Sequence, residues 1–388
     1  MTDRQRVAVI GGGIAGVSAA WALAADHDVI LLEAEPELAT HATGRSAAML
    51  SETSGPRAVC ALARASRPFF ERPPGGFTEH SLTAPRGLLW IGRDGDEPGL
   101  AEIARVAATG VAPTARRIDA AEACRIVPVL RESAVGGGGV FEPDARSIDV
   151  AALVAAFAAA ARSRGAEVRR RSAVRALRPT SGGGWRLHVD PSGGGNEVLV
   201  VDTVVNAAGA WGDRVAEAAG VSPLGLRPMR RTACLVPAPV DVSTWPLVMD
   251  VASRLYFEPE TGGLLLSPAD EHPSDAIDAR AEMEDVAWAL EMLAEATTLD
   301  VRHVRSSWAG LRTFTADRIP AAGWDPDAPR FCWLVGQGGA GIKTAPALAT
   351  VVASVVADTA WPDEVAALGV GPADLAPARL RQPADPVT

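Results

Sequence analysis

Cysteine, lysine and tyrosine are scarce in this sequence, and their scarcity excludes several classes of protein. Its 388 residues include four cysteines, at positions 60, 124, 234 and 332, which form no Cys-x-x-Cys pair. This spacing indicates neither a zinc site nor a disulfide framework and fits a reducing compartment. The net charge of −10 argues against a nucleic-acid partner, which would require a basic surface. We expect a cytoplasmic protein that binds no metal and no nucleic acid.

Catalytic patterns of hydrolases are also missing. The sequence has no His-Glu-x-x-His or Gly-x-Ser-x-Gly motif and no paired carboxylates in a catalytic pattern. Residues 7–25 are almost entirely apolar, but the run contains Gly11, Gly13 and Gly16 and is followed by an apolar strand that ends at an acidic residue. The glycines favour a buried strand, turn and helix over a signal peptide or a membrane span.

The glycine-rich run predicts a dinucleotide-binding loop. Residues 6–10 are expected to form a strand, residues 14–25 a helix and residues 29–32 a second strand. Gly11 permits the tight turn, Gly13 lets the backbone approach a diphosphate, and Gly16 lets helix and strand pack closely. The helix N-terminus offers unpaired N–H groups to the diphosphate. Glu33 follows Gly11 by 22 residues, where a carboxylate accepts hydrogen bonds from ribose hydroxyls.

Two later segments separate FAD from NAD. An apolar strand at 203–206 runs into Ala-Ala-Gly-Ala-Trp at 207–211, and a glycine-rich stretch at 336–343 precedes a helix expected at 345–359. Together with the first loop, these segments resemble the D-amino acid oxidase superfamily of flavoproteins, which includes glycine and sarcosine oxidases. Within it the sequence is most similar to the bacterial D-arginine dehydrogenases. The similar segments are 43–48, 126–131, 206–211, 223–226 and 308–312.

The resemblance implies an α/β fold with two domains. A discontinuous Rossmann-type FAD-binding domain would comprise residues 1–55, 145–225 and 305–388. An α+β substrate domain with a mixed, largely antiparallel sheet would comprise residues 56–144 and 226–304. Short alternating apolar runs bounded by Pro and Gly turns within 66–100 and 226–270 agree with antiparallel strands.

The resemblance also implies which residues bind the cofactor. Sarcosine oxidases tether the flavin through a cysteine near the 308–312 block, and no cysteine is present there, so we expect non-covalent FAD. The implied FAD-binding residues are Gly11, Gly13, Ile14, Ala15, Gly16, Glu33, Ala34, Thr43, Gly44, Arg45, Ser46, Ala48, Val174, Ala208, Gly209, Trp211, Gly310, Gly338, Gly339, Gly341, Ile342 and Lys343.

The family oxidises the CH–NH2 bond of an amino acid to an imine, which water hydrolyses to a 2-oxo acid and ammonia. The resemblance places Arg231, Arg312 and Tyr256 at the positions that bind the substrate carboxylate, a task for which the planar guanidinium is well suited. Tyr256 is the only tyrosine. Arg230 is adjacent to Arg231, and strand alternation sends one of them inward, but only the resemblance says which.

Lys343 is the only lysine of the chain. It lies at the entrance of the C-terminal helix, where sarcosine oxidases also have a lysine. A positive charge there, together with the helix N-terminus, is expected to stabilise the reduced flavin. The plain alternative is a solvent-facing lysine in the first turn.

The substrate pocket departs from the D-arginine dehydrogenases. Leu88 replaces the glutamate that pairs with the substrate guanidinium, Met49 replaces a histidine, and Ser54 replaces a lid tyrosine. With Ser51, Leu247 and Met249 these residues form the predicted pocket, which favours a D-amino acid with an apolar or uncharged side chain. Glu52 would offer a negative charge from another direction.

Two alternatives remain beside this function. One is oxidation of glycine or of a secondary amine, such as sarcosine or an N-substituted or cyclic amino acid, or of a 2-hydroxy acid, which would include a step in secondary metabolism. The other is a protein that binds FAD without turnover, against which the intact set of carboxylate-binding residues argues. The electron acceptor is either oxygen or a quinone-like molecule.

Overall fold

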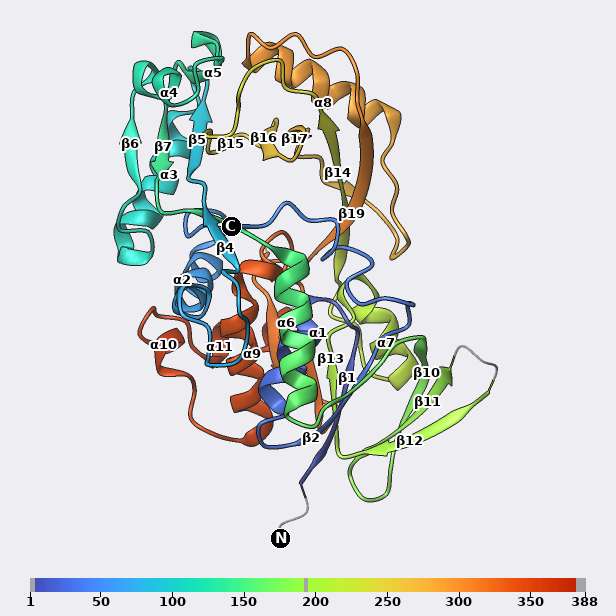
Figure 1. Ribbon diagram of the computed structural model, residues 1–388. Helices are drawn as coiled ribbons and strands as arrows, with labels where there is room; N and C mark the ends of the chain where they lie inside the picture. The colour runs from blue at the N-terminus through green and yellow to red at the C-terminus, as the bar shows by residue number, and fades with distance from the viewer. Residues whose placement is uncertain (1–3, 192–194, 382–388) are drawn as a thin grey trace.

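The protein consists of two lobes, one above the other (Figure 1). The structure is a computed structural model and describes residues 4–191 and 195–381. Each lobe is built on one large sheet, and the chain passes between the lobes several times. No helix of the described residues is long and apolar enough to cross a membrane.

The lower lobe contains a six-stranded sheet in the order β20-β21-β13-β1-β2-β9. All neighbouring pairs are parallel except β20 with β21. The strands are β1 (Arg6–Ile10), β2 (Asp28–Leu32), β9 (Glu167–Arg169), β13 (Thr203–Asn206), β20 (Ala321–Trp324) and β21 (Phe331–Val335).

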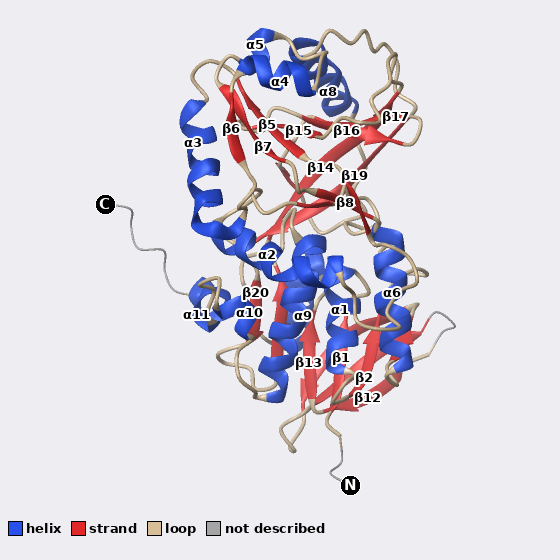
Figure 2. Cartoon of the chain, turned by 60° about the vertical axis from the view of Figure 1, so that its left-hand side comes forward, coloured by secondary structure: helices blue, strands red, loops and turns tan. Residues whose placement is uncertain are grey.

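Both faces of this sheet are covered. Helices α1 (Ile14–Leu23), α6 (Val150–Ser163) and α9 (Gly341–Ala357) lie together on one face (Figure 2). The other face packs against α7 (Gly212–Ala219) and a three-stranded sheet of β10 (Ser172–Pro179), β11 (Trp185–Pro191) and β12 (Glu197–Val201). Val7 and Val9 pack on the helical side, whereas Ala8 and Ile10 pack on the other side. This burial on both faces explains why the predicted strand reads as a continuous apolar run.

The upper lobe contains a nine-stranded sheet, with β19 paired to β14 beside the order β18-β14-β17-β16-β15-β5-β7-β6. Among its described pairs only β15 with β5 is parallel. The strands are β5 (Leu88–Gly92), β6 (Arg116–Ile118), β7 (Gly138–Glu142), β14 (Arg227–Val236), β15 (Leu247–Asp250), β16 (Tyr256–Glu260), β17 (Gly263–Ser267), β18 (His272–Pro273) and β19 (Ser306–Phe314). Helices α3 (Glu97–Val106), α4 (Ala120–Ile126), α5 (Glu132–Val135) and α8 (Met283–Ala296) pack around it.

Smaller elements complete the chain. A three-stranded sheet of β3 (Met49–Leu50), β8 (Arg146–Ile148) and β4 (Thr83–Pro85) lies near the junction of the lobes with α2 (Arg57–Glu71) (Figure 2). The remaining elements are a π-helical turn at Ala107–Val111, a 3-10 turn at Gly209–Trp211, the short helices α10 (Asp363–Ala366) and α11 (Pro372–Leu375), and a 3-10 turn at Pro377–Leu380.

The predicted fold class, an α/β protein with a Rossmann-type domain and a mixed, largely antiparallel second sheet, is confirmed. The division of the chain into segments stays a prediction. One element departs from it in the structure: β19 falls in the range 305–388 assigned to FAD binding, yet it pairs with β14 along its whole length, from Arg227↔Phe314 to Leu235↔Ser306. The helix expected at 345–359 spans Gly341–Ala357 in the structure. Pro346 lies inside it, where its missing N–H leaves the Ile342 carbonyl without a helical partner.

Glu258 is a buried carboxylic acid in the centre of the nine-stranded sheet. It lies on β16, two residues after Tyr256 and therefore on the same face. Burial raises the pKa of Glu258 from 4.5 to about 7, and the charge of Arg86 offsets only part of this effect. Between these two pH values the folded chain binds more protons than the unfolded chain, so the free energy of unfolding falls as the pH rises.

We expect Glu258→Gln to stabilise the protein above pH 7. A pKa raised from 4.5 to about 7 corresponds to a destabilisation of roughly 3 kcal/mol at pH 8, which a neutral amide avoids. Urea unfolding should therefore give similar stabilities for variant and wild type near pH 4 and a more stable variant at pH 8. The exposed neighbour Glu260→Gln serves as the control and should show no such divergence. Parallel pH curves for Glu258→Gln and wild type would contradict this account.

Candidate active site

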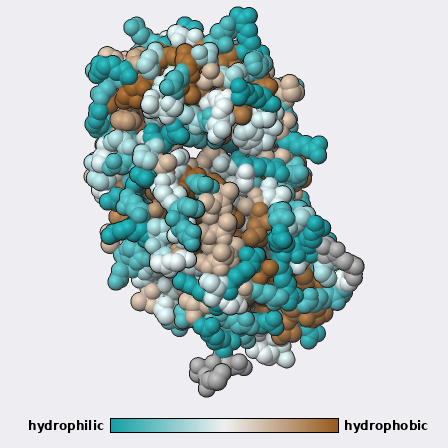
Figure 3. All heavy atoms as spheres, in the orientation of Figure 1, coloured by the Kyte–Doolittle hydropathy of each residue, from teal (hydrophilic) through white to brown (hydrophobic). Residues whose placement is uncertain are grey.

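A cavity of about 620 Å³ lies where the two lobes meet. Its lower wall comes from the ends of β1, β2 and β13 and from the N-termini of α1 and α9. Its upper wall comes from β14, β16 and β19. In the space-filling view, pale and apolar side chains surround a hollow between the lobes (Figure 3). Residues distant in the sequence are thus brought to one elongated site.

The first glycine-rich loop forms one end of this cavity. Gly13 precedes α1 with extended backbone and offers no capping side chain. The Ile14 N–H donates to Thr43 Oγ1 at 3.1 Å, so the N–H groups that follow it in the first turn are the ones left for a ligand. Gly16 faces the Gly11 carbonyl, and a Cβ there would lie 1.8 Å from that oxygen. Glu33 accepts a hydrogen bond from the Gly12 N–H at 2.5 Å. Two contacts therefore fix the shape of the loop. One is the close packing of Gly16 on the Gly11 carbonyl, and the other is the hydrogen bond to Glu33, the acid that follows β2.

The turn after β13 forms another wall. Buried Asn206 donates from Nδ2 to the Gly212 carbonyl at 2.8 Å and accepts from the Ala208 N–H at 3.3 Å. These bonds fix the 207–212 turn, so that Gly209 and Trp211 face the cavity. The Asn206 side chain is needed here because it pairs with two backbone groups of the turn, and leaving such groups buried without a partner is costly.

The third glycine-rich segment sets the N-terminus of α9 beside the cavity. Gly338 has a φ of +55°, and a Cβ there would lie 2.2 Å from the Phe314 ring. Its N–H donates to the Thr313 carbonyl at 2.8 Å. A Cβ on Gly339 would approach Arg312 Nη1 to 3.1 Å. Glycine is therefore required for the close contact between this turn and the end of β19.

Most of the predicted cofactor-binding residues line the cavity. Those that do are Gly11, Gly13, Ile14, Ala15, Glu33, Ala34, Thr43, Arg45, Ser46, Val174, Ala208, Gly209, Trp211, Gly310, Gly338, Gly339, Gly341 and Ile342. Gly16, Gly44, Ala48 and Lys343 are not among the lining residues. The role of Gly16 lies in packing α1 against Gly11, whereas the roles of the other three as cofactor contacts stay predictions.

Arg231, Arg312 and Tyr256 meet at the upper end of the cavity. Arg312 Nη2 donates to the Tyr256 hydroxyl at 3.4 Å, and the two guanidinium carbons lie 5.7 Å (Arg312) and 6.0 Å (Arg231) from the Tyr256 ring centroid. Burial, and then the positive charge of Arg312, lower the pKa of Arg231 to about 10. A negatively charged ligand between them would relieve both effects. The cavity therefore brings two guanidinium groups and one hydroxyl together at this end, as the sequence predicts for carboxylate binding.

Strand alternation separates the two adjacent arginines of β14. Arg231 lines the cavity, and its guanidinium donates to the Asp270 carbonyl at 2.5 Å and pairs with Glu271 at 3.0 Å. Arg230 points to the other side of the strand, where it pairs with Asp285 and Glu282. The prediction that Arg231 is the inward arginine therefore agrees with the geometry.

Lys343 is buried outside the cavity lining. Its Nζ donates to the backbone carbonyls of Ser51 at 2.9 Å and Ser54 at 2.6 Å. Burial lowers the pKa of Lys343, although the nearby charges of Glu142 and Glu52 oppose this. The alternative of a solvent-facing lysine is thus wrong. The contact of Lys343 with the flavin stays a prediction. Its two hydrogen bonds join α9 to the 51–54 segment.

The predicted substrate-pocket residues lie behind the cavity rather than on its surface. Leu88 and Leu247 are fully buried in an apolar cluster with Trp90, and Met49 and Met249 pack against this cluster. Met249 also packs against the cluster around Tyr256. The Ser51 hydroxyl donates to the Glu142 carboxylate at 2.9 Å, and the Ser51 carbonyl accepts from Lys343 Nζ. Ser51 therefore belongs to the buried hydrogen-bond network around Lys343.

Glu52 is not available to a ligand in the cavity. Its carboxylate pairs with Arg67 of α2, and burial raises its pKa despite this partner. The expectation that Glu52 offers a charge to the substrate is therefore not supported by its contacts. No local pattern indicates this pairing, because Arg67 is 15 residues away on a helix whose placement depends on the whole lobe.

Several cavity residues were not foreseen. Ala47, Ala233, Ile277, Ala279 and Thr313 line the cavity with the predicted arginines and tyrosine. Asp270 and Glu271, which hold Arg231, were also missed. The signal for these residues lies in strand register, since only the pairing of β14 with its neighbours brings them together.

Comparison with known proteins identifies the family of this chain. The sequence matches the family described as FAD dependent oxidoreductase over residues 6–355. The chain belongs to this family. It is 27% identical over 368 residues to a glycine oxidase of Geobacillus kaustophilus, covering 92% of this chain and 94% of the relative.

Solved structures of the same fold extend the comparison. The crystal structure of the Geobacillus kaustophilus glycine oxidase has a TM-score of 0.79 at 25% identity, covering 92% of this chain and 96% of that one. An L-proline dehydrogenase of P. horikoshii has a TM-score of 0.80 at 21% identity, covering 94% and 96%. An iminodiacetate oxidase of Chelativorans sp. BNC1 has a TM-score of 0.76 at 23% identity, covering 96% and 99%. These last two likenesses concern the fold alone.

The residues present fit FAD, the cofactor of the family. The glycine positions leave backbone exposed where a Cβ would collide, and the uncapped α1 N-terminus suits a diphosphate. The cavity continues from this end to Arg231, Tyr256 and Arg312. This FAD-dependent oxidoreductase is therefore expected to hold the dinucleotide along the lower wall, with a substrate beneath β14 and β16.

Gly16→Ala is expected to abolish FAD binding. The added methyl would lie 1.8 Å from the Gly11 carbonyl oxygen, so α1 must move away from the loop that it anchors. The purified variant should contain less than about a tenth of the flavin of the wild type, measured by absorbance, because even a 1 Å shift of the loop misplaces its N–H donors. Gly75→Ala, where nothing lies within 4 Å of the new Cβ and the backbone does not have a positive φ, is the control. Full flavin content in Gly16→Ala would disprove the role of this contact.

Lys343→Met is expected to destabilise the protein by about 3 kcal/mol, the usual cost of leaving buried partners without their charge. The change leaves the Ser51 and Ser54 carbonyls without a donor and the Glu142 carboxylate without a nearby cation. Thr350→Val on the same helix removes only a local bond to the Ala347 carbonyl and should change stability by less than about 1 kcal/mol. Equal urea midpoints for the two variants would contradict this tie.

Proposed function

We propose that this FAD-dependent oxidoreductase oxidises the C–N bond of an amino acid whose carboxylate binds between Arg231, Arg312 and Tyr256. The observation that supports it is the meeting of these three side chains in the cavity that also contains the dinucleotide-binding loop. A guanidinium presents parallel N–H groups to a carboxylate, and a tyrosine hydroxyl adds a third donor. Three convergent donors define one position and orientation for the substrate.

The chemistry follows from this orientation. FAD, when bound, accepts a hydride from the substrate Cα. The resulting imine is hydrolysed by water to a 2-oxo acid and ammonia. The residues of the chain hold the carboxylate, so that the Cα stays at a fixed distance from the lower wall. Small side chains at Ala47 and Ala233 leave space beside this position.

The preferred substrate is a D-amino acid with an apolar or uncharged side chain. Leu88 and Leu247 do not line the cavity, but their apolar cluster extends through Met249 to the cluster around Tyr256. The nearby acid Glu52 is already paired with Arg67. A cationic side chain in this region would lose its hydration without gaining a partner. The narrower resemblance to D-arginine dehydrogenases rests on the sequence segments alone and agrees with the positions of Arg231, Arg312 and Tyr256.

A secondary-amine substrate is the second candidate. A glycine oxidase and an iminodiacetate oxidase are among the similar proteins, and both names describe amines with little or no side chain. The apolar cluster behind the cavity would then serve packing only. Oxidation of a 2-hydroxy acid requires the same carboxylate-binding site and is included in the test below.

We further propose that FAD is bound non-covalently and that the protein acts in the cytoplasm. None of the four cysteines lines the cavity within the described residues, and burial raises the pKa of Cys60 to about 11 and of Cys332 to about 12. Such thiols are poor nucleophiles for attachment to a flavin. Acid precipitation should leave the yellow colour in the supernatant. Oxygen and a quinone-like molecule both stay candidates for the electron acceptor.

One anaerobic titration tests the proposed function. A panel of D- and L-amino acids, glycine, sarcosine, proline, iminodiacetate and 2-hydroxy acids is added to the flavoprotein, and bleaching of the flavin absorbance is followed. Bleaching by uncharged D-amino acids is expected. Faster bleaching by glycine or iminodiacetate would favour the second candidate, and the highest kcat/KM with D-arginine would contradict the apolar pocket. No bleaching by any acid would favour binding without turnover.

Arg312→Met is expected to lower kcat/KM by about 100-fold, because a lost charge-assisted hydrogen bond to a buried carboxylate costs roughly 3 kcal/mol. Tyr256→Phe should cost about tenfold, since it removes one neutral donor. FAD content should be unchanged in both variants. Arg305→Met, at an arginine bonded to the Gly262 carbonyl and outside the cavity, is the matched control. Unchanged kinetics in Arg312→Met would remove the basis of the proposed function.

A further inference from the structure

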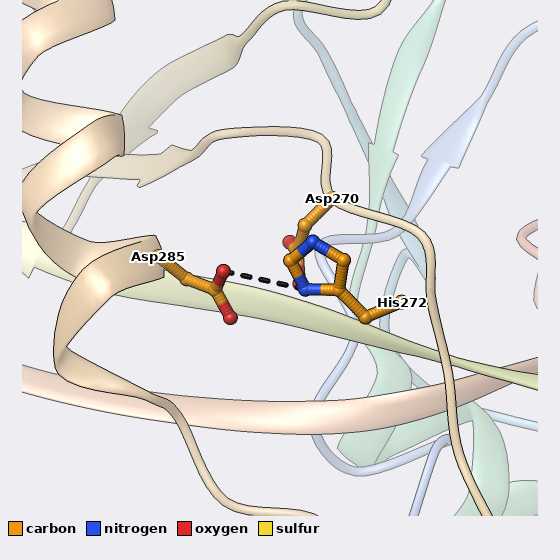
Figure 4. A group of neighbouring side chains, drawn as sticks. All are labelled: Asp270, His272 and Asp285. Atoms are coloured by element: carbon orange, nitrogen blue, oxygen red, sulfur yellow. Dashed lines mark ion pairs between the residues drawn. The ribbon is translucent and has the colours of Figure 1, made fainter.

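Three ionisable side chains gather on the side of β14 that faces away from the cavity. Asp270 follows β17, His272 begins β18, and Asp285 lies in the first turn of α8 (Figure 4). One atom of each lies within 4.8 Å of the others, and His272 Nδ1 is 3.4 Å from Asp285 Oδ1. Asp270 and Asp285 are both 3% exposed, so this is a buried acidic pair with a half-exposed histidine.

The cation of this cluster is Arg230. Its Nη2 lies 3.0 Å from Asp285 Oδ2 and 3.1 Å from His272 Nδ1. A metal ion bound to the same atoms would lie against a guanidinium, and the two positive charges would repel each other. The cluster is therefore better described as an arginine held by acids than as a metal site.

We propose that this cluster, formed by Arg230, Asp270, His272 and Asp285, positions Arg231 for the substrate carboxylate. The inference rests on the proposed function, because it assigns a purpose to residues that support its carboxylate-binding site. The residues on either side of Arg231 in β14 both bond to Asp285: Arg230 through Nη2, and Thr232 through Oγ1 at 3.1 Å. The backbone of Arg231 is thereby fixed to α8.

The second link runs through the segment 270–272. Asp270 Oδ1 accepts from the Thr232 N–H at 2.7 Å, while the carbonyl of the same residue accepts from Arg231 Nε. Glu271 pairs with Arg231 Nη2 and also with Arg318 at 2.7 Å. The segment 270–272 thus accepts hydrogen bonds from Nε and Nη2 of Arg231. These bonds fix the orientation of the Arg231 guanidinium toward Tyr256.

The third link is the anchoring of the segment itself. His272 and Pro273 pair with Arg230 and Met229 in the short ladder between β18 and β14. The His272 ring also contacts the Asp285 carboxylate and the Arg230 guanidinium. Loss of the Asp285 carboxylate would leave Arg230 with Glu282 alone and would release the Thr232 hydroxyl and the His272 ring. The segment that holds the Asp270 carbonyl opposite Arg231 would then be anchored less firmly. A shift of about 1 Å in a binding group is enough to weaken a site strongly.

The test is a double-substitution cycle on the FAD-loaded protein. Asp285→Asn is combined with Arg231→Lys, which keeps a positive charge but has no Nε to bond with Asp270. Binding of benzoate, a simple carboxylate, is measured by the change in flavin absorbance, and KM and kcat are measured with the best substrate of the panel. Asp285→Asn alone should raise the benzoate Kd and the KM about tenfold, with kcat changed less than about twofold and FAD content unchanged. In the Arg231→Lys background it should add less than about twofold.

Glu282→Gln is the matched control. Glu282 is the exposed partner of the same Arg230 but contacts neither Thr232 nor His272, so its loss should leave Kd and KM within about twofold of the wild type. His272→Gln, at a half-exposed site, replaces Asp285→Asn should the latter fail to fold. It should raise the Kd about threefold, again only when Arg231 is present.

The outcomes separate the two proposals. Wild-type protein that binds benzoate, with no rise in Kd for either Asp285→Asn or His272→Gln, overturns this inference and leaves the proposed function standing. A full tenfold effect of Asp285→Asn in the Arg231→Lys background also overturns it, because Asp285 would then act independently of Arg231. Wild-type protein that binds neither benzoate nor any acid of the panel overturns the proposed function and the inference with it.

Discussion

The antiparallel pairing of β14 with β19 is the interaction on which the candidate active site depends. Nine residue pairs join the strands, and both arginines that lie beside Tyr256 belong to them, Arg231 opposite Gly310 and Arg312 opposite Met229. A slip by one residue would place Arg231 and Arg312 on opposite faces of the sheet. Strand β19 ends at Phe314, which forms a β-bridge with Gln337 and so fixes the turn before α9. One ladder therefore sets Arg231 and Arg312 relative to the lower wall of the cavity.

The position of α9 extends this constraint into the lower lobe. Its N-terminal turn fits beneath β19 because Gly338 and Gly339 lack side chains. Lys343, one turn later, donates to carbonyls of the 51–54 segment, which Glu142 of β7 also holds. The two lobes thus share buried polar contacts as well as backbone. Such contacts are costly to leave partly satisfied, which restricts how far the lobes can separate.

The parts of this site that could be predicted from the sequence are those specified locally. The loop from Gly11 to Gly16 needs only its own glycines and the adjacent strand and helix, so its place at the cavity follows from the pattern. Leu88 and Lys343 differ, because their surroundings depend on contacts with residues far away in the sequence. Leu88 packs beside Leu247 through a parallel strand pair that no local pattern indicates. Arg67 neutralises Glu52 through the placement of a helix, and neither residue shows this by itself.

The adjacent arginines of β14 show how two identical residues acquire different tasks. Alternation sends their side chains to opposite faces, and the surrounding charge then decides what each can do. Arg230 meets Asp285 and Glu282, so its charge is balanced within the protein. Arg231 shares Glu271 with Arg318 and lies near Arg312, so its surroundings keep an excess of positive charge. An arginine left with unbalanced charge in a cavity attracts an anion, whereas its balanced neighbour stabilises the strand that holds it.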